Sequence, residues 1–79
     1  MNKKTKSADE LHALIIDELR KKNEFDSVTP SKPYWHERDT SGRNWDLSSW
    51  RGYLIDVVEA KNFLEVFVNN LRDRYDISE

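Results

Sequence analysis

The chain has no cysteine, only two glycines and two prolines, and no long run of hydrophobic residues. The lack of cysteine excludes a disulfide framework, a thiolate zinc site and a cysteine nucleophile. No apolar stretch approaches the ~18 residues of a membrane-spanning helix. None follows the lysine-rich start to make a signal peptide. We therefore expect a cytoplasmic protein that makes no contact with membranes and holds no cofactor.

What the chain does contain is charge and aromatic rings, in a length that allows one small domain. Its 79 residues are 37% hydrophobic and 35% charged, with three each of Trp, Tyr and Phe. This aromatic content argues against disorder. Residues 1–6, which include Lys3, Lys4 and Lys6, are predicted to be a disordered basic tail, and residues 7–77 a single small α+β domain. The net charge of −2 is unlike that of a general nucleic-acid binder, which normally has a basic face.

Two segments have the periodicity of amphipathic helices. Ser7 and Glu10 form a capping-box pattern, which predicts a helix from about residue 8 to residue 23. A second helix is predicted from about residue 57 to residue 74, with Asp56 as its N-cap. Its apolar stripe consists of Val57, Ala60, Leu64, Phe67, Val68, Leu71 and Tyr75.

Three apolar residues of the second helix lie off this stripe. Phe63 and Val66 lie beside or beyond it, and Val58 lies further round the helix. A cluster of exposed apolar residues often marks an interface. Both packing within the monomer and contact with a partner or a second copy are open interpretations for these three residues.

The stretch from Tyr34 to Trp50 holds all three tryptophans and a hairpin signal. A three-residue loop, Thr40 to Gly42, would place Asp39 opposite Arg43, and glycine readily adopts the left-handed conformation that closes such a loop. The ladder would then run from Arg38 opposite Asn44 to Tyr34 opposite Ser48. Because strand side chains alternate, one face of this hairpin would be apolar, with Trp35, Trp45 and Leu47, and the other polar, with Tyr34, His36, Arg38, Asn44, Asp46 and Ser48.

These elements predict an α+β fold in the order helix, two- or three-stranded antiparallel sheet, helix. Both helices would pack on the apolar sheet face, because a lone hairpin is only marginally stable in water. Val28 and Thr29 are candidates for a short third strand at the edge. The predicted core consists of Leu11, Ile15, Leu19, Trp35, Trp45, Leu64, Phe67 and Leu71.

The segment SGRNWDLSSW, followed near the C-terminus by LRDRYDI, resembles a group of small uncharacterised bacterial proteins. These proteins pair a helix beginning with an ELxxLI-like pattern, here Glu10 to Ile15, with a Gly-x-Asn-Trp strand and an end similar to Leu-x-x-Arg-Tyr-Asp. The resemblance spans most of the chain. It implies a shared fold and no catalytic residues.

The sequence offers little support for catalysis or metal binding. Ser48, His36 and Asp46 share the polar hairpin face, but a triad also needs a pocket and oxyanion donors. A simple cross-strand pair of His36 and Asp46 explains them as well. His12 has no partner at metal-ligand spacing, and we expect it to be a partly buried structural histidine. We therefore predict that the protein is not an enzyme and binds no metal.

Recognition is the better functional hypothesis. Tyr34, His36, Arg38, Asn44 and Trp50 combine aromatic planes with a guanidinium and an amide, and such residue types dominate protein interfaces. They predict a protein-interaction module, with Val58, Phe63 and Val66 as a further candidate interface and a homodimer as one form of it. The alternative is single-stranded nucleic-acid binding through the same aromatic and arginine-bearing face. An ordinary solvated sheet surface is the third interpretation.

Overall fold

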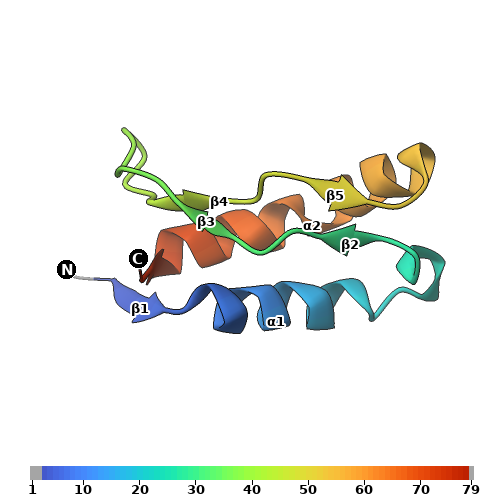
Figure 1. Cartoon of the computed structure of the whole chain (residues 1–79), viewed down its shortest axis with the longest axis horizontal. Coiled ribbons are helices and arrows are strands. Elements are labelled where there is room, and N and C mark those ends of the chain that lie inside the picture. The colour runs from blue at the N-terminus through green and yellow to red at the C-terminus, as the bar shows by residue number, and fades with distance from the viewer. Residues whose placement is uncertain (1–2, 79) are drawn as a thin grey trace.

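The computed structural model describes residues 3–78, and Figure 1 shows two helices running lengthwise with extended chain segments alongside them. The helices lie in contact with each other, and the molecule measures 38 × 20 × 20 Å. In chain order the elements are β1 (Lys4–Lys6), α1 (Ala8–Leu19), the short 3-10 helix η1 (Asn23–Phe25), β2 (Thr29–Pro30), β3 (Tyr34–Trp35), β4 (Trp45–Asp46), β5 (Trp50–Arg51), α2 (Leu54–Arg74) and β6 (Tyr75–Ile77).

The predicted mixture of helices with a small antiparallel sheet is present, but the strands form three separate pairs. β2 pairs with β5 and β3 pairs with β4, both antiparallel, while β1 pairs with β6 in parallel. The edge strand expected at residues 28–29 is β2, one residue further along the chain. The segment from β2 to β5 therefore leaves and returns as one long, interrupted hairpin (Figure 1).

The parallel pair corrects the prediction of a disordered tail. Lys4 to Lys6 lie beside Tyr75 to Ile77, and the amide of Ser78 donates to the Lys6 carbonyl at 3.0 Å. The Lys3 ammonium also donates to the Arg72 carbonyl at 3.1 Å. Residues 1–2 of the predicted tail lie outside the described residues. The described part of the tail is thus a strand that ties the two ends of the chain together.

Helix α1 begins as its capping box predicts. The amide of Glu10 donates to Ser7 Oγ, and the Ser7 amide donates to the Glu10 carboxylate. The helix ends at Leu19, four residues earlier than expected, with Arg20 as C-cap. Arg20 Nη1 donates to the carbonyls of Phe25 and Val28, both at 2.9 Å. Arg20 thus holds the returning chain instead of adding a helical turn.

Helix α2 begins one turn earlier than predicted. Tyr53 is the N-cap, and Asp56 lies inside the first turn, where a negative charge favours the helix dipole. Gly52 permits this early start with a φ of +139° and a close approach to the backbone of Ser27 and Val28. A side chain at this position would be both strained and crowded. The predicted N-cap role of Asp56 is therefore wrong.

The hairpin turn forms as predicted, but the strand register beyond the turn differs from the predicted register. The Asp39 amide donates to the Arg43 carbonyl at 2.9 Å, and Gly42 has a φ of +85°. Trp35, however, lies opposite Trp45 instead of Leu47. The His36 amide donates to the carbonyl of Asn44, and the Asp39 amide to that of Arg43. Glu37 and Arg38 are therefore two extra residues on the strand that enters the turn, with no counterparts on the strand that leaves it.

The core lies between the two helices and the strands. Six of the eight predicted core residues are buried, and Phe67 packs against the core while half-buried. Trp35 is the error, because it is 43% exposed while its partner Trp45 is fully buried. The other members of the hydrophobic core cluster, which the predicted core set did not include, are Phe25, Val28, Val57, Ala60, Val68 and Ile77.

Candidate functional site

Only part of the predicted recognition face is free to meet a partner. Tyr34 is exposed and His36 half-buried, with their rings 6.0 Å apart and inclined at 58°. His36 Nδ1 donates to the Glu37 carbonyl at 2.6 Å. Trp35 adds a third partly exposed ring on β3. The accessible aromatic part of this predicted face therefore consists of β3 and the residue that follows it.

Arg38 is engaged within the molecule. Its guanidinium donates to both carboxylate oxygens of Asp76, at 3.0 and 2.9 Å, and to the Gly42 carbonyl at 2.7 Å. Hydrogen bonding to the Arg38 guanidinium lowers the pKa of the Asp76 carboxyl, and the same bond raises the pKa of Arg38. Such two-pronged pairs are specific in geometry. Arg38 thus ties the hairpin to β6.

Asn44 and Trp50 also make contacts within the molecule. Asn44 is 8% exposed, and its amide bonds to the backbone of Ile77 on both sides. Trp50 is half-buried and packs against the core. The prediction that Asn44 lies on a free binding surface is wrong. The five predicted binding residues do not share one surface, since Asn44 points into the molecule.

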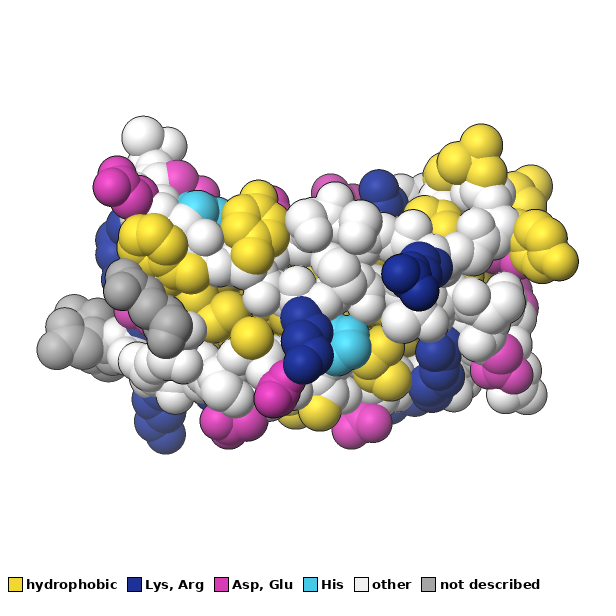
Figure 2. All heavy atoms as spheres, in the orientation of Figure 1, with side chains coloured by type: hydrophobic (Ala, Val, Ile, Leu, Met, Phe, Trp, Pro, Cys, Tyr) yellow, Lys and Arg dark blue, Asp and Glu magenta, His cyan; other side chains and the backbone are white. Residues whose placement is uncertain are grey.

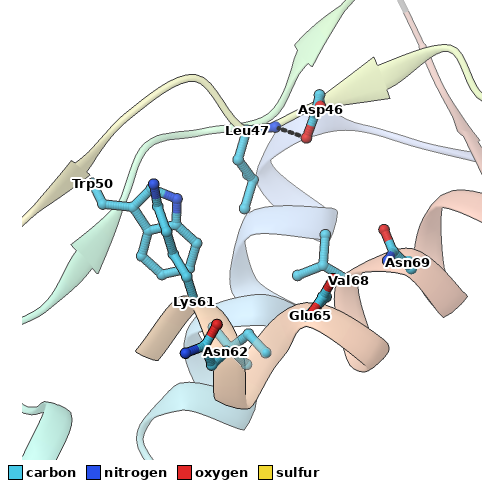
Figure 3. A pocket seen from close by; sticks show the side chains of 9 residues that line it. Asp46, Leu47, Trp50, Lys61, Asn62, Glu65, Val68 and Asn69 are labelled. Carbon is cyan, nitrogen blue, oxygen red and sulfur yellow. Dashed lines mark hydrogen bonds between the residues drawn. The ribbon is translucent and has the colours of Figure 1, made fainter. Parts of the chain in front are cut away.

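The Trp50 side chain does line a groove of about 360 Å³ between α2 and the chain leading from β4 to β5. Figure 3 shows Leu47 and Trp50 extending toward α2, whose Lys61, Asn62 and Glu65 form the opposite side. The Leu47 amide donates to Asp46 Oδ1 at 2.7 Å at the rim. The lining mixes both charge signs with amides and apolar groups. No single ligand class follows from this mixture.

Carboxylates and arginines at the hairpin end hold the turn against α2. Asp39 Oδ1 accepts from the Ser41 hydroxyl and from the amides of Ser41 and Arg43. These hydrogen bonds, led by that from the Ser41 hydroxyl, lower the pKa of Asp39 to about 2. The Arg43 guanidinium donates to both oxygens of Asp73 and thereby lowers the pKa of that carboxyl. Ion pairs and hydrogen bonds of charged side chains therefore hold this end of the molecule together.

Helix α2 presents the largest group of exposed apolar side chains. Val58 and Val66 are exposed as the sequence suggested, whereas Phe63 is half-buried, 5.8 Å from the ring of Phe25. Phe63 therefore packs within the monomer. Tyr53, Leu54 and Ile55 are even more exposed than Val58. Figure 2 shows hydrophobic side chains gathered where β5 leads into α2.

We call the exposed residues Tyr53, Leu54, Ile55, Val58 and Val66 the α2 apolar surface. The first three escaped sequence analysis because the helix was expected to begin at Val57. Starting the helix at Leu54 places Ile55, Val58 and Val66 on one face, at spacings of three and eight residues. Recognising Gly52 as a turn residue with a positive φ would have revealed this.

The residues considered for catalysis are not assembled into a site. Ser48 Oγ bonds with Ser31 Oγ at 3.2 Å, His36 bonds with a backbone carbonyl, and Asp46 accepts from a backbone amide. His12 Nε2 donates to the Pro30 carbonyl at 3.0 Å, which links α1 to β2. Among residues 3–78, no group of three His, Asp or Glu side chains is placed to hold a metal ion.

Comparisons with protein-family models, curated proteins and solved structures found no match. The resemblance to small bacterial proteins therefore stays a prediction. Within the described part of the chain, neither helix is both long and apolar enough to cross a membrane.

Proposed function

We propose that this protein is a small protein-interaction module that self-associates through the outer face of α2. The observation that carries the proposal is the α2 apolar surface. Leu54 is 80% and Val66 71% exposed, and scattered apolar residues on a protein surface are ordinary. Here, however, five exposed apolar residues lie on α2 and its N-cap, and four of them lie within the N-cap and the first two turns. Exposed apolar patches of this kind mark contact sites.

The outer face of α2 fits a second copy of itself. Val58 and Val66 each lie four residues from Asn62, which is exposed between them. If two α2 helices cross antiparallel with Asn62 at the two-fold axis, Val58 of each copy faces Val66 of the other. A two-fold interface is self-complementary in this way. Asn62 would then face its own copy, and a polar residue at such a position fixes the register.

The charges beside this face agree with the same arrangement. Lys61 and Glu65 lie on one flank of α2, and neither makes an ion pair within the described residues. Antiparallel pairing about Asn62 would bring Lys61 of one copy near Glu65 of the other. Opposite charges at the edge of a helix pair set its orientation. A homodimer therefore uses both the apolar and the charged residues of α2.

Protein contact is favoured over single-stranded nucleic-acid binding by the state of Arg38. Nucleic-acid platforms combine aromatic stacking with free cationic charge. Here Arg38, the cation of the hairpin face, is paired with Asp76. Tyr34 and Trp35 alone supply stacking without the charge that follows a phosphate backbone. They form a second, smaller surface for a protein partner.

Sedimentation equilibrium over about a hundredfold range of protein concentration tests the proposal. It yields the dimer Kd, and each tenfold change in Kd corresponds to ~1.4 kcal/mol. We expect a reversible monomer–dimer equilibrium for the parent chain. Val58→Glu combined with Val66→Glu should abolish it, because each dimer would bury four carboxylates. Leu14→Glu is the matched control, because it places the same charge at an exposed apolar site on α1.

A parent chain that stays monomeric throughout would contradict self-association and leave only a different protein as the partner. A dimer that survives the double substitution would place the contact elsewhere. Tyr34→Ser together with Trp35→Ser would then test β3. Circular dichroism of every variant shows whether it is folded, so that loss of the dimer is not confused with unfolding.

A further inference from the structure

A second cavity is separate from the surfaces described above. Its lining is chemically more uniform than that of the groove beside Trp50. It measures about 490 Å³ and is bounded by α1, β2 and β5. Cavities of this size accommodate small-molecule ligands. Its lining residues are His12, Thr29, Pro30, Ser31, Lys32, Ser49 and Arg51. Three hydroxyls, two cations and an imidazole therefore surround it, with no carboxylate in the lining.

Strand pairing explains why the hydroxyls meet there. Thr29 lies opposite Arg51, and the Ser31 amide donates to the Ser49 carbonyl at 2.9 Å. Alternate strand residues share a face, so Thr29, Ser31, Ser49 and Arg51 line the cavity side of the β2–β5 pair. Pro30 and Trp50 lie opposite each other between them. Pro30 also borders the cavity, although its side chain is fully buried. The small hydroxyl side chains leave the space that makes the cavity.

The hydrogen bonds of the hydroxyls leave donors available. Ser31 Oγ accepts from the amides of Ser48 and Ser49, at 3.3 and 3.2 Å. Its own hydrogen is then free to donate, either to Ser48 Oγ or into the cavity. Thr29 and Ser49 hydroxyls form no hydrogen bond with the described residues. The cavity thus has hydroxyl groups, carried by the β2–β5 pair and the residues beside it, that can donate hydrogen bonds to a ligand.

The two cations are suited to an anionic ligand. Arg51 makes no ion pair and no side-chain hydrogen bond with residues 3–78. Lys32 pairs with Asp9 at 2.7 Å, with both side chains well exposed, and an exposed pair of this kind is weak and easily exchanged. Figure 2 shows a cation beside a histidine where α1 borders β2, with another cation farther along the β2–β5 pair.

We propose that this cavity binds a phosphate monoester of a small molecule. The Arg51 guanidinium offers a planar fork of donors, Lys32 a mobile point charge, and the hydroxyls neutral donors, a set that matches the oxygens of a phosphate group. His12 is oriented by its bond from Nε2 to Pro30, which leaves Nδ1 as the other polar atom of the ring. The remaining volume holds the organic part of the ligand.

The test uses the intact chain labelled with ¹⁵N and titrated with glycerol 3-phosphate. We expect amide shifts that saturate with a Kd in the millimolar range or tighter, confined to residues 12, 29, 31–32 and 49–51. Inorganic phosphate should produce the same pattern more weakly, because it lacks the organic part. Glycerol, titrated in parallel, should produce none.

Two substitutions assign the binding to this cavity. Arg51→Gln and Lys32→Gln should each weaken glycerol 3-phosphate binding about tenfold, as expected when one charged hydrogen-bond donor is removed. Arg74→Gln and Lys21→Gln are the matched controls, because they remove the same charges outside the cavity, Lys21 from an exposed ion pair with Glu18, and they should leave the Kd unchanged. Both cavity variants alter exposed side chains, so the ¹⁵N spectra should keep the parental dispersion.

The proposal is overturned if no saturable shift occurs up to roughly 10 mM ligand, a concentration at which millimolar binding would be evident. Equal weakening by the cavity and control variants would also overturn it, since it would show only a general attraction of anions. The proposal would also be overturned if a single-stranded oligothymidylate bound through residues 29–32 and 49–51 and glycerol 3-phosphate did not bind. That result would assign the cavity to a nucleic-acid backbone.

Discussion

The side-chain amide of Asn44 takes the place of a neighbouring strand along Ile77. Its Oδ1 accepts from the Ile77 amide at 3.0 Å, and its Nδ2 donates to the Ile77 carbonyl at 3.3 Å. Next to it, Trp45 Nε1 donates to the Tyr75 carbonyl at 3.0 Å. β6 is therefore bonded by the β1 backbone and by side chains from β4 and the residue before it. This arrangement joins the hairpin to both ends of the chain.

Asn44→Ala should lower the free energy of unfolding by about 2–4 kcal/mol, because two buried backbone groups of Ile77 lose their partners. Urea denaturation followed by tryptophan fluorescence measures the change. Asn44→Asp sharpens the test. At neutral pH its carboxylate would accept from the Ile77 amide but repel the Ile77 carbonyl, so its pKa should be raised in the folded protein.

The sign of the pH effect on Asn44→Asp follows from that raised pKa. A protonated carboxyl can donate to the Ile77 carbonyl, so the deficit of Asn44→Asp relative to the parent should be smallest at low pH. The deficit should grow as pH rises through the folded pKa. A deficit that is independent of pH would show that this side chain is solvated and not bonded to Ile77.

The two paired tryptophans of the hairpin should differ sharply on substitution. Trp45 is fully buried and Trp35 is 43% exposed. Trp45→Ala should cost about 3–5 kcal/mol, enough to unfold a domain of this size, whereas Trp35→Ala should cost under about 1.5 kcal/mol. Thermal melts of the two variants provide the comparison. Equal costs would contradict the burial of Trp45 and the register that pairs these residues.

The first strand should matter to stability through its backbone rather than its charge. Removing residues 1–6 deletes β1 and its bonds to β6, and should cost about 1–3 kcal/mol if two or three net backbone hydrogen bonds are lost. Replacing Lys4 and Lys6 with Gln keeps the strand and serves as control. Urea midpoints that fall equally for both variants would assign the effect to charge.

Acid should destabilise the protein through the carboxylates at the hairpin end. The pKa of Asp39 is lowered to about 2 from 3.8, and the pKa values of Asp73 and Asp76 are also lowered by their partners. A folded pKa below the unfolded one contributes stability above the unfolded pKa, and this is lost as pH falls through the folded value. The loss should therefore occur between about pH 4 and about pH 2.

Asp39→Asn isolates the Asp39 contribution, because Asn keeps an acceptor for Ser41 and Arg43 but carries no charge to titrate. Urea midpoints measured against pH should fall less steeply for this variant than for the parent in that range. Asp26→Asn is the control, because the Asp26 side chain has no hydrogen bond or ion pair among the described residues. An acid limb unchanged by Asp39→Asn would contradict the assignment.

Sequence reasoning succeeded where structure depends on neighbouring residues. The Ser7–Glu10 capping box, the periodicity of α2 and the Gly42 turn are all local, and all are present. The errors in the tail and on the hairpin face involve distant partners. The Lys4–Lys6 segment has no apolar alternation and becomes a strand only because Tyr75 to Ile77 lies beside it.

The candidate binding face failed for the same reason. Alternation assigned Arg38 and Asn44 to a polar hairpin face, but it did not indicate what these two residues contact. Asn44 is hydrogen-bonded to a residue 33 positions away in the sequence and Arg38 to one 38 positions away. Both side chains are therefore engaged with β6. Composition alone cannot distinguish a polar residue that awaits a partner from one that already has a partner within the fold. The same limit applies to Phe63, whose partner Phe25 lies on η1.

Phe63 and Val66 should therefore separate stability from association. Phe63 packs on Phe25, with the Lys22 ammonium 5.4 Å from its ring, so Phe63→Ala should cost about 2–4 kcal/mol of unfolding free energy. Val66 is exposed, and Val66→Ala should change the unfolding free energy by under about 0.5 kcal/mol. In sedimentation equilibrium the effects should reverse: Val66→Ala weakens the dimer, whereas folded Phe63→Ala keeps the parental dimer constant. If Phe63→Ala left stability unchanged and weakened association, Phe63 would be part of the interface after all and its contact with Phe25 would be incidental.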